Sequence, residues 1–349
     1  MVMLEFSKKI KMLLILVTLF VVIWVGISIL KRNSSVEKNS TNGLFVKNHH
    51  YYSLIKLDNG RLFLFADRHV LQKKSSEIND ILVFSSEDFG KNWTVFKKIP
   101  GMSCSDENSV IFFKNKFFLK VICDSANFYQ TGKLNILSIN IENKTTEISN
   151  SYCDMSKLCL YENNLVFTTK GEVHFLSDDF DVNKIMNTSY SGFTDYFVIN
   201  GSLFAYCMYS DYILNITDNS SYKVPFQIID VVACENEGIY FVYRGSDKKL
   251  YVANYSKDMK MKTTSKVDGY NFLTGIKCVN SVIVGIAKED YNSVPGVVCS
   301  NDNGKSWTST GIKGNVLSPY CIKDDSLFVL SLNYFSDAPI FNSLSLKNN

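Results

Sequence analysis

Short apolar segments recur along the chain after residue 43, and each follows a cluster of turn-forming residues. The clearest are Leu62–Phe65, Phe117–Val121, Leu165–Thr168, Leu203–Tyr206, Ile239–Tyr243, Val282–Ile286 and Leu327–Leu330. The 3.6-residue spacing of an amphipathic helix is almost absent from this region. Short apolar runs between Asn-, Asp- and Gly-rich turns are typical of β-hairpins. We therefore expect an all-β body.

The apolar segments repeat at intervals of roughly 35–55 residues, and a repeat of this length built from antiparallel strands predicts a β-propeller. Each blade is then a sheet of four antiparallel strands. Residues 43–349 form one domain of six blades, with seven as the alternative. A β-sandwich is the second choice of fold, but it does not require one strand–turn–strand unit to recur along the whole body.

Two eight-residue segments share the pattern Ser-x-Asp-x-Gly-x-x-Trp. Their shared positions are Ser86, Asp88, Gly90 and Trp93 in the first copy, and Ser300, Asp302, Gly304 and Trp307 in the second. The pattern predicts a tight hairpin, because Ser and Asp bind turn amides, Gly accepts a positive φ, and Trp packs on the sheet. Degenerate copies begin at Ser177 and Ser256. We interpret both aspartates as structural rather than catalytic.

Residues 12–30 are almost entirely apolar, with only Thr18 and Ser28 as weak interruptions. As a helix, 19 such residues span a bilayer. We expect a cytoplasmic tail (1–11), a transmembrane signal anchor (12–30) and a polar stalk (31–42). A cleaved signal peptide is the competing interpretation, although no small-x-small cleavage site follows the run.

Sequons and cysteines, which all follow residue 30, orient the chain. The nine Asn-x-Ser/Thr sequons lie at Asn33, Asn39, Asn92, Asn143, Asn187, Asn200, Asn215, Asn219 and Asn254. We expect Asn92, which lies inside a tight turn, to be unmodified. The nine cysteines permit an oxidising compartment, with Cys153–Cys159 as a local bridge or several cysteines as buried free thiols. These features predict a single-pass type II membrane glycoprotein with a lumenal or extracellular body.

Charge and composition exclude several classes of function. The chain has 46% hydrophobic residues and a net charge of +3, and the basic excess lies in residues 1–32. The body is nearly neutral, so we expect no nucleic-acid partner. The four histidines do not form a metal-ligand pattern, and we expect no metal or cofactor. Arginine is rare, with only four residues.

Three parts of the chain resemble the sialidases and trans-sialidases. Residues Tyr52–Asp67 are similar to the family's first blade, Asp230–Arg244 to its glutamate- and arginine-bearing strands, and Lys323–Leu330 to its last hairpin. The two octapeptides resemble its Asp box, also called the BNR repeat. The likeness covers most of the body and is weak between 124 and 225. It implies a six-bladed propeller that grips a sialic acid carboxylate with three arginines.

The resemblance places only one of those arginines in this chain. Arg244 matches the second arginine, and His50 stands where the first should be. No arginine lies at Tyr291–Val294, where the third is expected. Arg68 lies one residue from the position of the family's additional pocket arginine. We therefore expect Arg244, Arg68 and His50 to bind substrate, with His50 contributing when it is protonated.

The family's catalytic groups are also altered. Asp230 occupies the position where the family has the carboxylate that activates its tyrosine nucleophile. Tyr320 lies three residues after the position expected for that tyrosine, and Glu77 lies near the position expected for the general acid. The corresponding structural interpretations are a hydrogen-bonded acid at a strand end for Asp230 and a core aromatic for Tyr320. For Arg244 the structural alternative is an ion pair with Asp247.

Three hypotheses about function follow. The first is a membrane-tethered, sialidase-like pseudoenzyme that binds a sialylated glycan or a protein. The second is an active exo-α-sialidase, a glycoside hydrolase, with a rearranged site. The third is a structural glycoprotein of the cell surface or secretory pathway. Convergence of an acid, a Tyr–carboxylate pair and at least two cations at the propeller axis would favour the second.

Overall fold

The computed structural model describes residues 37–40, 49–68, 80–105, 110–123, 133–153, 155–188, 192–234, 237–279, 281–314, 320–323, 326–333 and 336–346. The predicted tail, membrane anchor and Glu77 lie outside these residues. Among the described residues, no helix has the length and apolar character needed to cross a membrane. The chain divides into two units, 1–37 and 38–349, and the second contains the sheets.

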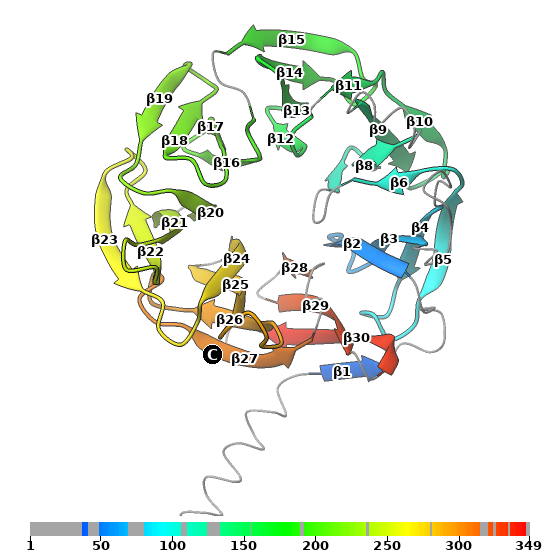
Figure 1. Cartoon of the computed structure of the whole chain (residues 1–349). Helices are drawn as coiled ribbons and strands as arrows, with labels where there is room; N and C mark the ends of the chain where they lie inside the picture. Colours follow the sequence, from blue (N-terminus) through cyan, green and yellow to red (C-terminus); the bar gives the residue numbers. More distant parts are fainter. Residues whose placement is uncertain are drawn as a thin grey trace, which may run out of the picture. The chain divides into compact units, whose positions relative to one another are not determined.

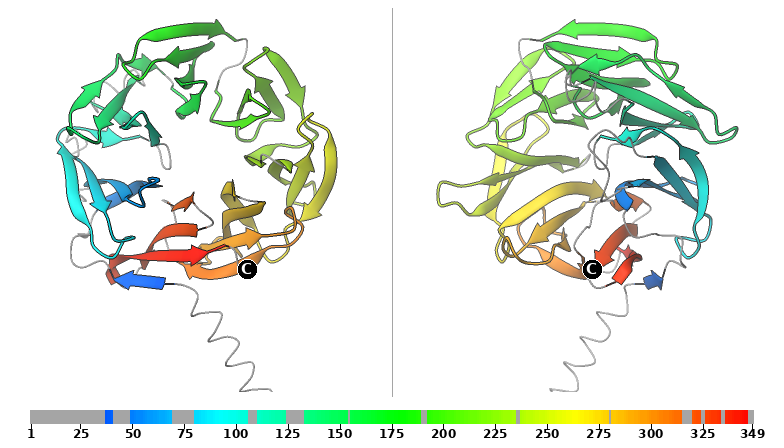
Figure 2. Two further views of the ribbon diagram at one scale, coloured as in Figure 1. Left: turned by 180° about the vertical axis from the view of Figure 1, so that it is seen from behind. Right: turned by 45° about the vertical axis from the view of Figure 1, so that its right-hand side comes forward.

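Seven antiparallel sheets follow one another around a central axis (Figures 1 and 2). In blades 1 and 3 to 6, consecutive strands pair and the first strand is the innermost. In blade 2, β6 and β7 both pair with β8, and β10 and β11 both pair with β9; in blade 7 the order from the axis outward is β28, β29, β30 and β1. The body is therefore a seven-bladed β-propeller. The expectation of six blades, which the sialidase resemblance implied, is wrong, and the alternative of seven is correct.

The first four blades use the strands from β2 to β19. Blade 1 contains β2 (His49–Lys56), β3 (Leu62–Arg68), β4 (Ile81–Ser86) and β5 (Thr94–Ile99). Blade 2 contains β6 (Ser103–Cys104), β7 (Ile111–Phe113), β8 (Lys116–Ile122), β9 (Lys133–Asn140), β10 (Thr146–Ile148) and β11 (Tyr152–Cys153). Blade 3 contains β12 (Cys159–Tyr161), β13 (Asn164–Thr169), β14 (Glu172–Leu176) and β15 (Val182–Asn187). Blade 4 contains β16 (Asp195–Ile199), β17 (Ser202–Tyr206), β18 (Tyr212–Asn215) and β19 (Ser220–Lys223).

The last three blades complete the ring. Blade 5 contains β20 (Ile228–Cys234), β21 (Gly238–Arg244), β22 (Leu250–Tyr255) and β23 (Met261–Lys266). Blade 6 contains β24 (Phe272–Val279), β25 (Val282–Lys288), β26 (Gly296–Ser300) and β27 (Thr308–Lys313). Blade 7 contains β28 (Tyr320–Lys323), β29 (Ser326–Asn333), β30 (Ser336–Ser345) and, from the other end of the body, β1 (Glu37–Ser40).

The seventh blade joins the two ends of the body. Its outermost strand, β1, pairs with β30, which is the last strand in the sequence. Residues 37–40, inside the predicted stalk, thus belong to the sheet, and the propeller begins before residue 43.

The second strand of each blade forms the centre of the core. The seven apolar segments of the sequence analysis fall one each in β3, β8, β13, β17, β21, β25 and β29. In β3, Leu62 to Ala66 are completely buried, because each sheet packs on a neighbouring blade through both faces. The dominant apolar signal therefore marks one strand per blade.

Hairpin turns alternate between the two faces of the ring. Since each blade has its strands antiparallel and in order, the chain leaves a blade on the face where it entered. Turns between first and second strands, and between third and fourth strands, share what we call the hairpin-turn face; examples are Asn200 and Ser86–Trp93. Turns between second and third strands, and connections between blades, share the opposite face.

The two octapeptides fold into matching turns on the hairpin-turn face. In blade 1, the Ser86 hydroxyl donates to Asp88 (2.8 Å) and accepts from the Gly90 amide (2.8 Å). The Trp93 indole N–H donates to the Gly90 carbonyl (3.0 Å). In blade 6, the equivalent bonds measure 2.8, 2.9 and 3.2 Å. The tight hairpin that the pattern predicted is therefore present, and both aspartates bind their own turns.

The degenerate copies preserve one bond of this turn. The Ser177 hydroxyl accepts from the Asp181 amide (3.1 Å), and the Ser256 hydroxyl accepts from the Lys260 amide (3.1 Å). In both, as in the octapeptides, the donor lies four residues after the serine. The serine and the aspartate two residues after it are thus the constant residues of the turn, while the glycine and the tryptophan are variable.

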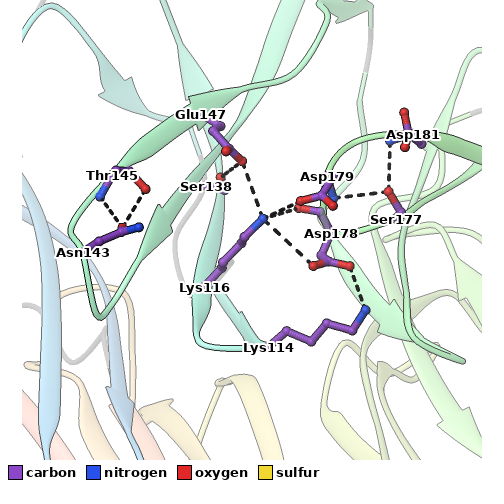
Figure 3. Close-up of polar contacts among 10 residues, drawn as sticks. All are labelled: Lys114, Lys116, Ser138, Asn143, Thr145, Glu147, Ser177, Asp178, Asp179 and Asp181. Carbon is purple, nitrogen blue, oxygen red and sulfur yellow. Dashed lines mark hydrogen bonds and ion pairs between the residues drawn. The ribbon is translucent and has the colours of Figure 1, made fainter.

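These turns also contact the preceding blade. A β-carbon placed on Gly90 would lie 2.4 Å from the ring of Phe341 in blade 7. In blade 6, Asn303 accepts a hydrogen bond from Tyr240 of blade 5 (3.0 Å). In blade 3, the carboxylate of Asp179 pairs with Lys116 of blade 2 at 2.7 Å (Figure 3). The turns therefore hold adjacent blades together.

One disulfide joins the innermost strands of two blades. Cys234 at the end of β20 bonds to Cys278 in β24, with their Cα atoms 5.6 Å apart. Cys153 and Cys159 are both free thiols, so the expected local bridge is wrong. Sequence proximity favoured that pair, whereas ring packing brings together residues 44 positions apart.

Candidate functional site

A cavity of about 460 Å³ lies at the propeller axis, among the innermost strands of blades 4, 5 and 6. Its volume is within the range of about 300–1,000 Å³ that is typical of small-molecule sites. Its lining comes from β16, β20 and β24 (Figure 1), together with Lys157, Thr194, Tyr206 and Met208. Because Lys157, Thr194 and Met208 lie in interblade connections or in a second-to-third turn, the cavity approaches the face opposite the hairpin turns. We call this the cavity face.

Two β-bulges shape the cavity wall. The register of β20 with β21 shifts between Ile228 and Asp230, and that of β24 with β25 shifts between Thr274 and Lys277. A bulge bends its strand and redirects the neighbouring side chains. Gly275 supports the second bulge, because its φ of 60° lies in the region that glycine adopts most easily. The two bulges bring the Asp230 carboxylate to the backbone of β24.

Asp230 receives hydrogen bonds from three blades. Its carboxylate accepts from the amide of Ile276 in blade 6 (3.0 Å), from its neighbour Val231 in blade 5 (2.8 Å) and from the Tyr206 hydroxyl in blade 4 (3.2 Å). Burial raises the pKa of Asp230 to about 6, although the two amide donors act in the opposite direction. This carboxyl group therefore changes charge close to neutral pH.

Tyr206 is fixed as a hydrogen-bond donor. Its side chain is buried, and burial, together with the nearby Asp230 carboxylate, raises the pKa of its phenol well above the usual value. The phenol stays neutral at physiological pH, and a neutral phenol is a weak nucleophile.

Lysines and a second aspartate complete the polar lining. Lys157 pairs with Asp195 at 2.5 Å across the boundary between blades 3 and 4, and both side chains are about one third exposed. Burial lowers the pKa of the second amine, that of Lys277 in β24. The cavity thus combines two amines, two carboxyl groups and a phenol, which can bind a ligand carboxylate and its hydroxyl groups.

The residues predicted from the sequence to form the site do not all lie at the cavity. Asp230 lines the cavity. His50 and Tyr320 lie on β2 and β28, the innermost strands of blades 1 and 7, while Arg68 lies on the second strand β3; the described part of the structure does not include their side chains. Glu77 is outside the described residues. Only Asp230 among these residues is brought to the cavity by the described geometry.

Arg244 lies away from the cavity lining. It is exposed at the end of β21 and donates to the carbonyl oxygens of Lys248 (2.8 Å) and Asn271 (2.6 Å). Its guanidinium also stacks on Phe272, 5.2 Å from the ring centroid. These bonds hold the turn after β21 against blade 6. They replace the ion pair with Asp247 that was the structural alternative for this arginine.

Sequence reasoning missed Lys157, Asp195, Tyr206 and Lys277. They come from four separate segments, and no spacing rule connects them. One local signal was available, because a glycine such as Gly275 inside an apolar strand often marks a bulge.

Comparisons with known proteins identify the fold. No family model matches the chain, and no curated protein matches its sequence. Among solved structures, the β-propeller domain of the Trilobed protease from Pyrococcus furiosus is 11% identical and has a TM-score of 0.55, over 87% of this chain and 97% of that one. The CNH domain of AfRom2 is 9% identical with a TM-score of 0.58, over 89% of this chain and all of that one. The Pyrococcus horikoshii acylaminoacyl peptidase is 9% identical with a TM-score of 0.55, over 84% of this chain and 50% of that one.

These likenesses establish the propeller fold alone. At such low identity, unrelated functions share one architecture.

Proposed function

We propose that the chain is a membrane-tethered propeller whose axial cavity binds a sugar that carries a carboxylate, without hydrolysing it. The observation that carries the proposal is the mixed lining of this cavity, with the amines of Lys157 and Lys277 beside the carboxyl groups of Asp195 and Asp230. Amines attract a ligand carboxylate, and carboxylates accept hydrogen bonds from sugar hydroxyls. A sialylated glycan has both groups.

The state of Tyr206 argues for binding rather than turnover. Burial and the nearby Asp230 carboxylate raise the pKa of its phenol well above the usual value, which disfavours the ionised form that would attack. The guanidinium of Arg244 is committed to backbone carbonyls outside the lining. A ligand carboxylate would therefore meet lysine amines, which bind as point charges rather than as bidentate forks.

The proposed membrane anchor and the proposed location of the body are supported by features of the sequence. The apolar run 12–30 is long enough for a membrane anchor, and all nine sequons follow it. The Cys234–Cys278 disulfide is consistent with an oxidising compartment. We place residues 33–349 in the lumen of the secretory pathway or outside the cell.

One observation favours a second candidate, an exo-glycosidase. Tyr206 and Asp230 form a Tyr–carboxylate pair 3.2 Å apart, the combination that retaining sialidases use. The raised pKa of Tyr206 opposes this role. Turnover of a sialoside is the measurement that separates the two candidates.

The test uses the full chain in detergent. A sialylated trisaccharide and its neutral core disaccharide are titrated by calorimetry, and a fluorogenic sialoside is supplied in parallel. We expect binding of the sialylated sugar only, no fluorescence release, and loss of binding in Lys277→Met. Lys248→Met, an exposed residue outside the lining, is the matched control and should bind normally. Equal binding by both sugars, or no binding of either, would exclude the proposal.

A further inference from the structure

The nine sequons differ in how the folded chain presents their asparagines. Asn215 and Asn254 are buried, with 4% and 8% of their surface exposed. The side-chain oxygen of Asn215 accepts from the amide of Thr217 (3.0 Å). A glycan needs a solvent-facing asparagine, so neither site can carry one once its blade has packed.

Asn92 is exposed, but its side-chain amide is already hydrogen-bonded within its own turn. Its side-chain nitrogen donates to one Asp88 oxygen (2.6 Å), and its backbone amide donates to the other (2.8 Å). The side-chain nitrogen is the atom that would bear the sugar. A glycan there would crowd the carboxylate that organises the Ser86–Trp93 turn.

Asn143 has the opposite arrangement. It is exposed in the turn between β9 and β10, and its side-chain oxygen accepts from both the amide (2.9 Å) and the hydroxyl (2.7 Å) of Thr145 (Figure 3). The sequon hydroxyl therefore contacts its own asparagine. Among the described residues, the Asn143 side-chain nitrogen has no partner and is open to solvent.

Asn200 and Asn219 lie in two tight turns of blade 4. Asn200 is between β16 and β17, and Asn219 is between β18 and β19; both are exposed. Their φ angles of 51° and 59° are values that asparagine tolerates better than most residues. Among the described residues, neither side-chain amide makes a hydrogen bond.

All three open asparagines share the hairpin-turn face. Asn143 and Asn219 are in third-to-fourth turns, and Asn200 is in a first-to-second turn. The cavity approaches the opposite face, through Thr194 and Met208. Glycans at these positions would leave the cavity face uncovered.

We propose that the folded protein carries N-linked glycans at Asn143, Asn200 and Asn219, and none at Asn92, Asn215 or Asn254. The proposal rests on the lumenal placement of the body but not on the ligand of the cavity. It makes one face of the propeller a glycan-shielded surface. The sequons at Asn33, Asn39 and Asn187 are not part of the proposal. In each of them, the asparagine side chain or the Ser/Thr residue two positions later lies outside the described part of the structure.

The first test maps occupied sites directly. The full chain is expressed in the secretory pathway of a eukaryotic cell, purified, and treated with peptide-N-glycosidase F in heavy-oxygen water before mass spectrometry. We expect the heavy label at the three proposed asparagines and at none of the three excluded ones. Label at Asn92, Asn215 or Asn254, or its absence from the proposed sites, would overturn the assignment.

Single substitutions check each site separately. Thr145→Ala, Ser202→Ala and Ser221→Ala each remove the hydroxyl residue of one sequon, and each should lower the apparent mass by one glycan. Lys144→Ala and Ser220→Ala change the middle residue of a sequon and serve as matched controls with unchanged mass. A substitution that leaves the mass unchanged overturns that site.

Protease protection of intact microsomes separates this proposal from the proposed function. A body that external protease digests and that carries no glycan removes the lumenal placement and the glycan sites together. A protected body without glycans overturns the sites alone. Sugar binding is then measured on the deglycosylated chain, because the cavity approaches the other face.

Discussion

The ring of Phe341, in the last blade, lies against Gly90 in the first blade so closely that a β-carbon at position 90 would come within 2.4 Å of it. Gly90 also has a φ of 84°. Two independent constraints, backbone conformation and contact between blades, therefore require glycine at this position.

Replacing Gly90 with alanine should destabilise the fold more than backbone strain alone explains. We expect Gly90→Ala to cost about 3–5 kcal/mol, from about 1–2 kcal/mol for the positive φ and the rest from overpacking against Phe341. Gly101 is the matched control, because it has a φ of 72° but no atom within 4 Å of a β-carbon. Gly101→Ala should cost only about 1–2 kcal/mol. Equal losses in urea denaturation would contradict the contact between blades.

The two turn tryptophans should differ in their importance. Trp93 is buried, whereas Trp307 is half-buried. We expect Trp93→Ala to cost about 3–5 kcal/mol and Trp307→Ala less. Asp88→Ala should cost about 1–3 kcal/mol, since it leaves the turn amides without an acceptor. Unchanged melting temperatures for both tryptophan variants would show that the turns do not support the blades.

Lys116 and Lys114 provide a matched pair at the boundary between blades 2 and 3 (Figure 3). The Lys116 side chain is 15% exposed and contacts Asp179 and Glu147, while Lys114 is 53% exposed and pairs with Asp178 at 2.8 Å. Lys116→Met should cost about 1–3 kcal/mol, because it leaves acidic groups unpaired at the boundary. Lys114→Met should cost less than about 1 kcal/mol.

The Lys114 pair also predicts a pH dependence. The hydrogen bond from Lys114 lowers the pKa of Asp178. The folded pKa lies below the unfolded value of about 3.9, so the stabilisation is complete well above that pH and is lost as the pH falls through the folded pKa. The difference in stability between the wild type and Lys114→Met should therefore shrink from pH 7 to pH 3. A difference that grows in acid would contradict the ion pair.

Binding of an anionic sugar should strengthen in mild acid. Because the pKa of Asp230 is raised to about 6, this carboxylate becomes neutral as the pH falls from 7.5 to 5 and no longer repels a ligand carboxylate. Lys277, whose pKa burial lowers, gains charge in the same direction. One pKa unit of coupling corresponds to about a tenfold gain in affinity. Calorimetry should show this gain in the wild type and a flatter profile in Asp230→Asn; weaker binding at pH 5 would contradict the assignment.

Removal of β1 should destabilise the last blade. A chain lacking residues 1–42 loses the outermost strand of blade 7 and leaves β30 as an open edge. We expect a loss of about 1–3 kcal/mol from the missing strand hydrogen bonds and a tendency to aggregate. A chain lacking residues 1–32 retains β1 and is the control. Identical unfolding curves for the two truncated chains would exclude a structural role for β1.

The sequence predicted the fold through its most buried strands. Segments such as Leu62–Phe65 and Leu203–Tyr206 are buried on both faces, so they appear as unbroken apolar runs, and there is one for each of the seven blades. The error of six blades came from the family resemblance and not from this pattern. Edge strands have no comparable signal, because β19 alternates between half-buried and exposed side chains and β1 contains no apolar residue.

The site was only partly predictable. Asp230 was found from the family resemblance, at the position of the carboxylate that activates the nucleophile, but its partners Tyr206 and Ile276 come from neighbouring blades. These segments come together only when the ring closes, and no local sequence pattern predicts which blades become neighbours at the cavity. The contribution of Lys277 also depends on a bulge, because a one-residue change in register moves a side chain to the other face of a strand.

The pairing of β1 with β30 determines when the propeller can close during synthesis. About 300 residues separate the two strands, so β30 follows β1 from the ribosome by about 15–60 s at the usual rate of synthesis. During that interval β1 is an unpaired strand, while the intervening blades can already pack on one another. The ring therefore cannot close before β30 has been synthesised, and a delay in the synthesis of blade 7 prolongs the exposure of two complementary strand edges to other nascent chains.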